Sequence, residues 1–332
     1  MRLSTRILLI AAPLLMPCVP AQAQAQAQES VDAFPSRPFR LIVPYSPGSG
    51  TDLGARRAMQ GIADRLGKPM VAENRTGATG LIAMTELARS VPDGYTLAHV
   101  NIALSIAQAI MPEMNFSLPR DVAGVGLYAS QYAVIVVPES QGIKNVADLV
   151  KLAKSKPGAL SFGSGGNGTP AHMTCELFRR SVGIDAVHIN YKSIVTALND
   201  TARGELQFSC SVLGNVVPLL KQGRLRALAV SNPARSAALP DVPTLTELGV
   251  KGVDVRSWAG IVAPAKTPPA IIAKLNRALR ETVADPQVRT FYENLGLDLA
   301  DGDNSPAQMD ALMRAESTRW AGIAKELNLK VD

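Results

Sequence analysis

The stretch FRLIVPYSPGSGTDLGARRAMQGIADRL, from Phe39 to Leu66, determines the class of fold. Its first seven residues form a short apolar run that enters a turn rich in proline and glycine, as buried strands do. From Asp52 onward, one face of an expected helix is apolar, formed by Ala55, Ala58, Met59, Ile62 and Leu66. A strand, a glycine turn and a helix in this order predict one unit of a parallel sheet.

The same alternation continues along the chain. Expected strands are residues 39–45, 69–74, 95–100, 132–138, 160–165, 186–191, 206–212, 225–231 and 258–264. Expected helices are residues 52–66, 80–90, 146–155, 171–183, 194–204, 216–223, 268–284 and 305–327. The pattern predicts two α/β lobes, each with a mainly parallel sheet flanked by helices, followed by C-terminal helices.

Residues 1–27 have the composition of a secretory signal peptide. Arg2 and Arg6 precede an apolar run over residues 7–16, and Ala-x-Ala cleavage sites follow. The run is well short of the roughly 20 residues that a membrane span needs. Pro17 disfavours lipid attachment at Cys18. We therefore expect a soluble, exported mature protein.

The composition excludes a nucleic-acid partner. The formal net charge of +6 falls to +4 without Arg2 and Arg6, the remaining basic residues are scattered, and only 5% of residues are aromatic.

The mature chain keeps Cys175, in an expected helix, and Cys210, in an expected strand. Two buried thiols are the expectation, and a disulfide is the alternative.

Three glycine-rich turns connect strands to helices, at residues 47–52, 74–80 and 164–169. Helix N-termini bind anions through unpaired N–H groups, and such turns gather at the carboxyl ends of parallel strands. Gly163 and Gly168 have the spacing of a phosphate loop, but Thr169-Pro170 replace its Lys-Ser/Thr. The turn therefore suits a carboxylate held by neutral donors better than a nucleoside triphosphate.

Cofactor and catalytic motifs are sparse. Gly48, Gly50 and Gly54, with Glu73 about 20 residues later, imitate a dinucleotide fingerprint. Prolines frame this turn and the protein is expected to be exported, so we expect no cofactor. The chain has no G-x-S-x-G or H-E-x-x-H motif, and its three histidines are far apart in sequence. We expect neither a catalytic nor a metal site.

Eight segments occur in a fixed order along the mature chain: PSRPFRLIVPYSPGSGTD, VAENRTGATG, PDGYTL, GSGGNGTPAH, VHINYK, GRLRALAV, LPDVPTLTELG and WAGIVAPAKTP. From about residue 34 to the C-terminus the chain resembles the Bug-type periplasmic receptors of tripartite tricarboxylate transporters. The resemblance implies a type II, Venus-flytrap binding protein of two lobes. Lobe one would comprise residues 30–137 and 258–332, and lobe two residues 138–257.

The resemblance also implies the ligand-binding residues. In the family, a carboxylate is held by backbone amides and hydroxyls of one glycine turn per lobe. In the first turn these residues are Tyr45, Ser46, Gly48, Ser49, Gly50, Thr51 and Asp52. In the second they are Ser164, Gly165, Gly166, Asn167, Gly168, Thr169 and His172. Asn101, Tyr191 and Ser211 complete the expected cleft.

Three departures from the family pattern bear on the ligand. The usual PGGGTD is PGSGTD here, Ser193-Ile194 replace the Gly-Gly after Tyr-Lys, and Ser211 replaces a common aspartate. Losing that carboxylate would remove a counter-charge for a ligand ammonium group, and Ile194 would reduce the space beside Tyr191. We therefore expect a small carboxylate without an amine, aliphatic or aromatic.

The expected function is capture of this ligand by lobe closure and its delivery to a membrane permease or a sensor kinase. The receptor is expected to act as a monomer. Trp258, at the expected hinge, would either report closure or pack in the core. The alternative is an exported hydrolase that uses His172 and a nearby serine, although the sequence displays no orienting carboxylate for such a pair.

Overall fold

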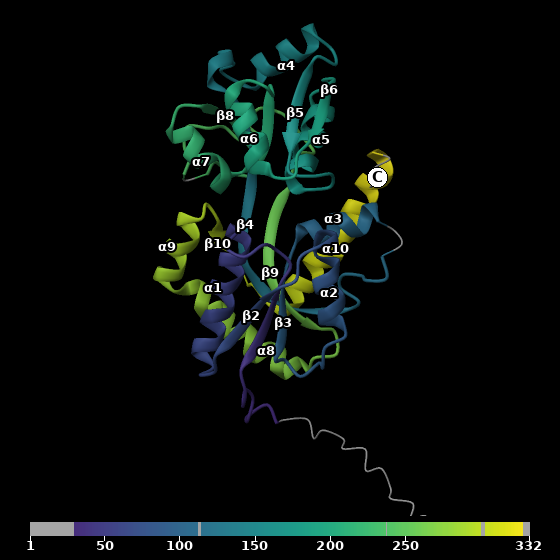
Figure 1. Cartoon of the computed structure of the whole chain (residues 1–332), viewed down its shortest axis with the longest axis vertical. Coiled ribbons are helices and arrows are strands. Elements are labelled where there is room, and N and C mark those ends of the chain that lie inside the picture. The colour runs from purple at the N-terminus through teal and green to yellow at the C-terminus, as the bar shows by residue number, and fades with distance from the viewer. Residues whose placement is uncertain (1–29, 112–113, 237, 300–302, 328–332) are drawn as a thin grey trace, which may run out of the picture.

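The computed structural model describes residues 30–111, 114–236, 238–299 and 303–327. The predicted signal peptide lies outside the described residues. Two lobes lie end to end, and two long strands run between them (Figure 1). These are β4 (Val122–Pro138) and β9 (Arg256–Pro264).

Lobe one is built on a sheet in the order β2-β1-β3-β9-β4-β10. Its other strands are β1 (Phe39–Val43), β2 (Met70–Asn74), β3 (Thr96–Asn101) and β10 (Asp298–Leu299). Its helices are α1 (Gly50–Arg65), α2 (Leu81–Ala88), α3 (Ile102–Ile110), α8 (Pro269–Ala284), α9 (Pro286–Asn294) and α10 (Pro306–Leu327), with a 3-10 turn, η1 (Ala78–Gly80). β1 pairs in parallel with β2 and β3, whereas β9 is antiparallel to β3 and β4.

Lobe two contains β5 (Leu160–Ser164), β6 (Ala186–Asn190), β7 (Phe208–Val212) and β8 (Leu225–Val230). Its helices are α4 (Val146–Ser155), α5 (Pro170–Ser181), α6 (Ile194–Arg203) and α7 (Leu213–Lys221), with a 3-10 turn, η2 (Glu139–Gln141). β5 is parallel to β6 and β7, and β4 is antiparallel to β7 and β8. Both sheets are therefore mixed, and the strands that precede the first and third glycine turns lie in their parallel parts.

β4 belongs to both sheets. Residues up to Tyr132 pair with β9, and residues from Ala133 onward pair with β7 and β8. The expected lobe boundaries, after residues 137 and 257, fall within β4 and β9. The chain thus passes between the lobes along β4 and at the start of β9, and this connection is called the hinge region.

Each lobe has apolar cores on both faces of its sheet. Trp258 is 1% exposed within a lobe-one core, as core packing predicts. That core also includes Met173, from α5 of lobe two, and a Cβ atom at Gly168 of lobe two would lie 2.5 Å from Ile110 Cδ1 of α3. The two lobes are therefore in contact. Among the described helices, none is long and apolar enough to cross a membrane.

Several elements differ from the sequence-based expectation. α3 and α9 were not expected, and β4 begins ten residues before the predicted strand at residue 132. In this added part of β4, Gly124 and Gly126 interrupt the apolar pattern of the strand, and its register against β9 shifts at the same place.

Cys175 and Cys210 form a disulfide, so the expectation of two buried thiols is wrong. The second turn of α5 packs directly on β7, which brings the two Cα atoms to 5.6 Å. That distance is typical of a bridge. A helix and a strand that are separate in sequence thus become covalently joined neighbours.

Candidate ligand-binding cleft

A cavity of about 340 Å³ lies between the lobes. Lobe one contributes Pro44, Tyr45, Thr51, Gly77, Thr79, Gly80, Asn101 and Ala103. The hinge region contributes Gln131, Ala133, Val255 and Ser257. Lobe two contributes Gly165, Thr169, Pro170, Ala171, Thr174, Ile194, Ser211, Val212 and Asn215. None of these lining residues of the described chain bears a charged side chain.

Six helices begin at this cavity. Thr51 is in the first turn of α1, and Gly80, Asn101, Thr169 and Val212 are the N-cap residues of α2, α3, α5 and α7. The sixth helix, α6, begins at the lining residue Ile194. Each helix N-terminus has unpaired N–H groups and about half a positive charge. These helix termini make the cavity electropositive, although no lysine or arginine of the described chain lines it.

Two of these helix starts lack a side-chain cap. Gly80 and Val212 make no side-chain capping hydrogen bond to α2 or α7 within the described chain. The first N–H groups of α7 follow Ser211, and Asn215 lines the same wall. Free N–H groups beside hydroxyl and amide side chains are what a carboxylate needs.

The first glycine turn is held in shape by Asp52. This buried carboxylate accepts hydrogen bonds from the Gly48 amide (2.9 Å), Arg56 Nε (2.9 Å) and Asn74 Nδ2 (2.8 Å). Burial disfavours its ionised form, but the bonds from Gly48, Asn74 and Arg56 outweigh burial and lower the pKa of Asp52. Ser49 Oγ caps α1 by accepting from the Asp52 amide. Asp52 thus positions the turn, while Thr51 faces the cavity.

Tyr45 and Asn101 form the polar corner of lobe one. Asn101 Nδ2 donates to Tyr45 Oη at 2.7 Å, and Asn101 Oδ1 caps α3 by accepting from the Ala103 amide at 3.1 Å. Burial raises the pKa of Tyr45 to about 12, against the opposing effect of Asn101. Tyr45 is therefore protonated at neutral pH and retains a proton to donate to a ligand.

The glycine turn of lobe two is held by internal hydrogen bonds. Thr169 Oγ1 donates to the Gly166 carbonyl (2.8 Å) and caps α5 by accepting from the His172 amide (3.3 Å). The Gly168 amide donates to His172 Nδ1 (3.1 Å). Gly165 contacts α6 closely, since a Cβ there would lie 2.8 Å from the Ile194 nitrogen.

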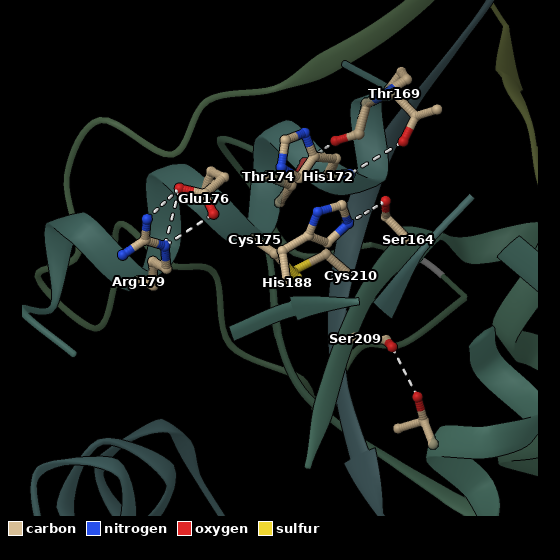
Figure 2. The surroundings of a disulfide bond; sticks show 12 residues. Ser164, Thr169, His172, Thr174, Cys175, Glu176, Arg179, His188, Ser209 and Cys210 are labelled. Atoms are coloured by element: carbon tan, nitrogen blue, oxygen red, sulfur yellow. Dashed lines mark hydrogen bonds and ion pairs between the residues drawn. A yellow bond between two sulfur atoms is a disulfide. The ribbon is translucent and has the colours of Figure 1, made fainter. Parts of the chain in front are cut away.

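His172 supports this turn as a neutral imidazole. It stacks on His188 with ring centroids 4.1 Å apart (Figure 2). Burial, with the nearby charges of His188 and Arg179, lowers the pKa of His172 to about 3. Because its Nδ1 accepts from Gly168, protonation at this atom would break the hydrogen bond that holds the turn.

The wall formed by β7 and α7 carries Ser211. It is 1% exposed and follows Cys210 directly. Ser211 Oγ accepts from Asn215 Nδ2 at 3.2 Å, which leaves its own proton available for a ligand oxygen.

The turn at residues 77–80 has a strained backbone. Gly77, Ala78, Thr79 and Gly80 all have positive φ angles, and two of them are not glycine. Gly77, Thr79 and Gly80 line the cavity. Consecutive residues in sparsely populated conformations cluster at functional sites. The sequence identified this turn but did not place its residues in the cleft.

Of the seventeen predicted ligand-binding residues, the structure brings Tyr45, Thr51, Asn101, Gly165, Thr169 and Ser211 to the cavity wall. Another ten lie in or beside the two turns without appearing in that wall: Ser46, Gly48, Ser49, Gly50, Asp52, Ser164, Gly166, Asn167, Gly168 and His172. Tyr191 is also absent from that wall: its amide donates to the Ser164 carbonyl at 3.0 Å, and its hydroxyl donates to Asp200 Oδ2 at 2.8 Å. Gln131, Ser257, Thr174 and Asn215 were missed, because single polar residues within strands and helices give no motif.

Two other groups of residues that could indicate a cofactor or a catalytic site lie outside the cavity. Glu73, the last residue of the imitated dinucleotide fingerprint, is paired with Arg40 at 2.9 Å and Arg75 at 2.7 Å. Ser164 Oγ lies 2.8 Å from His188 Nε2, but Ser164 is fully buried and outside the cavity wall. Its hydroxyl is therefore not placed to attack a ligand in the cleft. Among the described residues, no group of three His, Cys, Asp or Glu side chains has metal-binding geometry.

Comparison with known proteins agrees with this arrangement. The protein-family model described as tripartite tricarboxylate transporter family receptor matches residues 54–329 of this chain. The chain belongs to this receptor family. Protein BugT from Bordetella pertussis is similar, at 31% identity over 94% of this chain and 95% of BugT.

Solved receptor structures have the same two-lobe fold. The periplasmic binding protein BugD is 28% identical over 90% of this chain and 99% of its own, with a TM-score of 0.76. An R. palustris protein solved with adipate is 29% identical over 90% of this chain and 99% of its own, with a TM-score of 0.79. The receptor family and the two-lobe α/β fold expected from the sequence are confirmed.

Proposed function

We propose that the protein is a periplasmic receptor that captures a small carboxylate between its lobes and delivers it to a tripartite tricarboxylate-type transporter or to a sensor. The observation that carries this proposal is the convergence of six helix N-termini on a cavity without charged side chains. Neutral N–H and O–H donors bind an anion without competing internal ion pairs. Receptor-family membership and the relative solved with adipate point the same way.

The lining also supports an amine-free ligand. No acidic side chain of the described chain lines the cavity, and Asp52, which lies beside it, already accepts three hydrogen bonds. An ammonium group would enter an electropositive cavity without a counter-charge and would lose its hydration. The proline, alanine, valine and isoleucine residues in the wall suit an aliphatic or aromatic body.

The disulfide supports export. Disulfides persist in oxidising compartments such as the bacterial periplasm, and the buried Cys175–Cys210 bridge agrees with the predicted signal peptide. Lobe closure on one anion would favour the closed state through the ligand's differential affinity for it.

A thermal-shift screen tests the proposal. The mature protein is unfolded and refolded to remove any carried ligand, and then titrated with adipate, malate, citrate and benzoate. Each acid that binds is compared with its matched amine: 2-aminoadipate for adipate and aspartate for malate. We expect one acid to raise the melting temperature as its concentration increases. At 100 times its Kd, the acid should add about 2.7 kcal/mol to the free energy of unfolding, and the matched amine should add less.

Two outcomes would contradict parts of this proposal. A flat response to every acid would exclude a carboxylate receptor of this size class. A larger shift with the amines would retain the receptor but exclude the amine-free ligand. Turnover of an ester or amide panel by the purified protein would instead support the exported hydrolase.

A further inference from the structure

The Cys175–Cys210 disulfide lies directly behind the lobe-two wall of the cleft. It joins the second turn of α5 to β7, and both cysteines are fully buried (Figure 2). The residue before Cys175 is Thr174, and the residue after Cys210 is Ser211. Both neighbours are buried and both line the cavity. Each cysteine of the bridge is therefore the sequence neighbour of a residue in the cavity wall.

These two elements carry most of the donors that lobe two presents. α5 begins with Thr169, Pro170 and Ala171 at the cavity, and β7 leads through Ser211 into the uncapped start of α7. The hydrogen bonds within the turn before α5 connect Gly166, Gly168 and Thr169 to α5 itself. They fix the shape of the turn, and the pairing of β5 with β7 anchors its start, whereas α5 itself is held on β7 by packing and by the bridge.

We propose that the Cys175–Cys210 disulfide is a positioning element of the binding cleft. It fixes the N-terminal end of α5 relative to Ser211 and the start of α7. The distance between the two helix N-termini is thereby held constant, so that both can bind the same ligand anion. The inference rests on the proposed carboxylate-receptor function and adds a residue pair that touches no ligand. Because the donors must be held within about 0.5 Å, a small displacement of α5 on β7 weakens binding.

The competing role is stabilisation alone. A bridge between residues 35 apart restricts the unfolded chain and would stabilise lobe two wherever it lay. Phe178→Leu provides a matched control. Phe178 is a fully buried residue of α5 that packs edge-on against Phe208 of β7, with ring centroids 6.1 Å apart. This substitution weakens the same core but leaves the bridge intact.

The first measurement needs no ligand. Amide hydrogen exchange is compared in the unliganded wild type, in Cys175→Ala/Cys210→Val and in Phe178→Leu. Valine keeps most of the lost side-chain volume, so the double variant is expected to fold. We expect exchange to increase about tenfold at residues 165–175 and 211–216 in the double variant, with α1 and α3 unchanged. In Phe178→Leu these segments should match the wild type.

The second measurement is a double-mutant cycle with adipate, or with the best acid of the screen. Removing the disulfide should lower affinity about tenfold in the wild type and less than twofold in a Ser211→Ala background. In a Thr51→Ala background, which alters lobe one, the tenfold loss should persist, because unconnected sites are additive.

Failure of this inference is distinct from failure of the proposed function. Unchanged exchange at residues 165–175 and 211–216 in a folded double variant would overturn the positioning role, whatever the ligand is. Full additivity with Ser211→Ala, or equal affinity losses in Phe178→Leu and the double variant, would also overturn it. A wild-type protein that binds no acid would refute the receptor function, and exchange would still decide the role of the bridge.

Discussion

Gly214 of lobe two and Gly296 of lobe one meet backbone to backbone. A Cβ atom at Gly214 would lie 2.2 Å from the Leu295 carbonyl oxygen, and one at Gly296 would lie 2.4 Å from the Gly214 Cα atom. This contact and the inclusion of Met173 of lobe two in a lobe-one core join the lobes at separate places. Both are contacts between the lobes in the arrangement that the structure shows.

Gly214→Ala should therefore hinder closure. Gly214 is within α7, where alanine is a better helix former than glycine, so lobe two should fold normally. Its methyl group would instead collide with the Leu295 carbonyl of lobe one. We expect ligand affinity to fall about tenfold or more, measured by calorimetric titration. X-ray scattering should show a larger radius of gyration with saturating ligand than for the wild type.

Gly322→Ala is the matched control. Gly322 is also within a helix, α10, and a Cβ there would meet no atom of the described residues within 4 Å. This variant should gain about 0.5–1 kcal/mol of stability with unchanged affinity. Equal affinity of the Gly214→Ala variant and the wild type would show that closure does not require the glycine contact.

Ser211→Asp should change the ligand class. A carboxylate in the wall repels a ligand carboxylate and supplies the counter-charge that a ligand ammonium group needs. We expect adipate affinity to fall more than tenfold and the affinity ratio of 2-aminoadipate to adipate to rise at least tenfold. Ser211→Ala, which removes only the donor, should weaken both ligands alike. An unchanged ratio in the aspartate variant would mean that the amine position of the ligand lies elsewhere.

Tyr45→Phe should weaken binding without weakening the fold. Tyr45 lines the cavity and its hydroxyl is held by Asn101, so we expect the substitution to remove a donor to the ligand anion, worth roughly 1.5–3 kcal/mol, or about 10- to 150-fold in Kd. Tyr128→Phe should show the opposite pattern. Its hydroxyl lies 2.8 Å from His99 Nδ1, away from the cavity, and its loss should lower stability by about 1 kcal/mol at unchanged affinity. Similar profiles for the two variants would remove Tyr45 from the ligand contacts.

The sequence predicted the parts of the fold that local pattern determines. Apolar strands that end in glycine turns identified β1, β5 and the helices after them, and these turns predicted an anion site, whereas the cleft between two lobes was implied by the family resemblance. α3 was missed because it follows β3 at Asn101 without an intervening turn. The first part of β4 was missed because Gly124 and Gly126 interrupt its apolar pattern.

The cleft itself depended on long-range contacts that no motif encodes. Gln131 and Ser257 reach the cavity because β4 and β9 pair across the hinge, where Gln131 lies opposite Ser257. Asp52 fits the binding motif, but folding brings Arg56 and Asn74 onto its carboxylate and leaves it as a support of the turn. The disulfide required a helix to pack on a strand 35 residues away.

His172→Asn should make stability less sensitive to acid. Burial lowers the pKa of His172 to about 3, below its unfolded value of about 6.5, so between these values the unfolded chain binds the extra proton and stability falls as pH falls. Asparagine offers an oxygen to accept from the Gly168 amide but does not titrate.

Urea unfolding between pH 7.5 and 4.5 measures this difference. Below about pH 6, the wild type should lose stability faster than His172→Asn, by up to about 1.4 kcal/mol per pH unit, which corresponds to one proton. Part of the wild-type slope should remain in the variant, because burial also lowers the pKa of His99 and His188. Parallel curves for the two proteins would mean that His172 titrates normally in the folded state, and that its contact with Gly168 does not depend on a neutral ring.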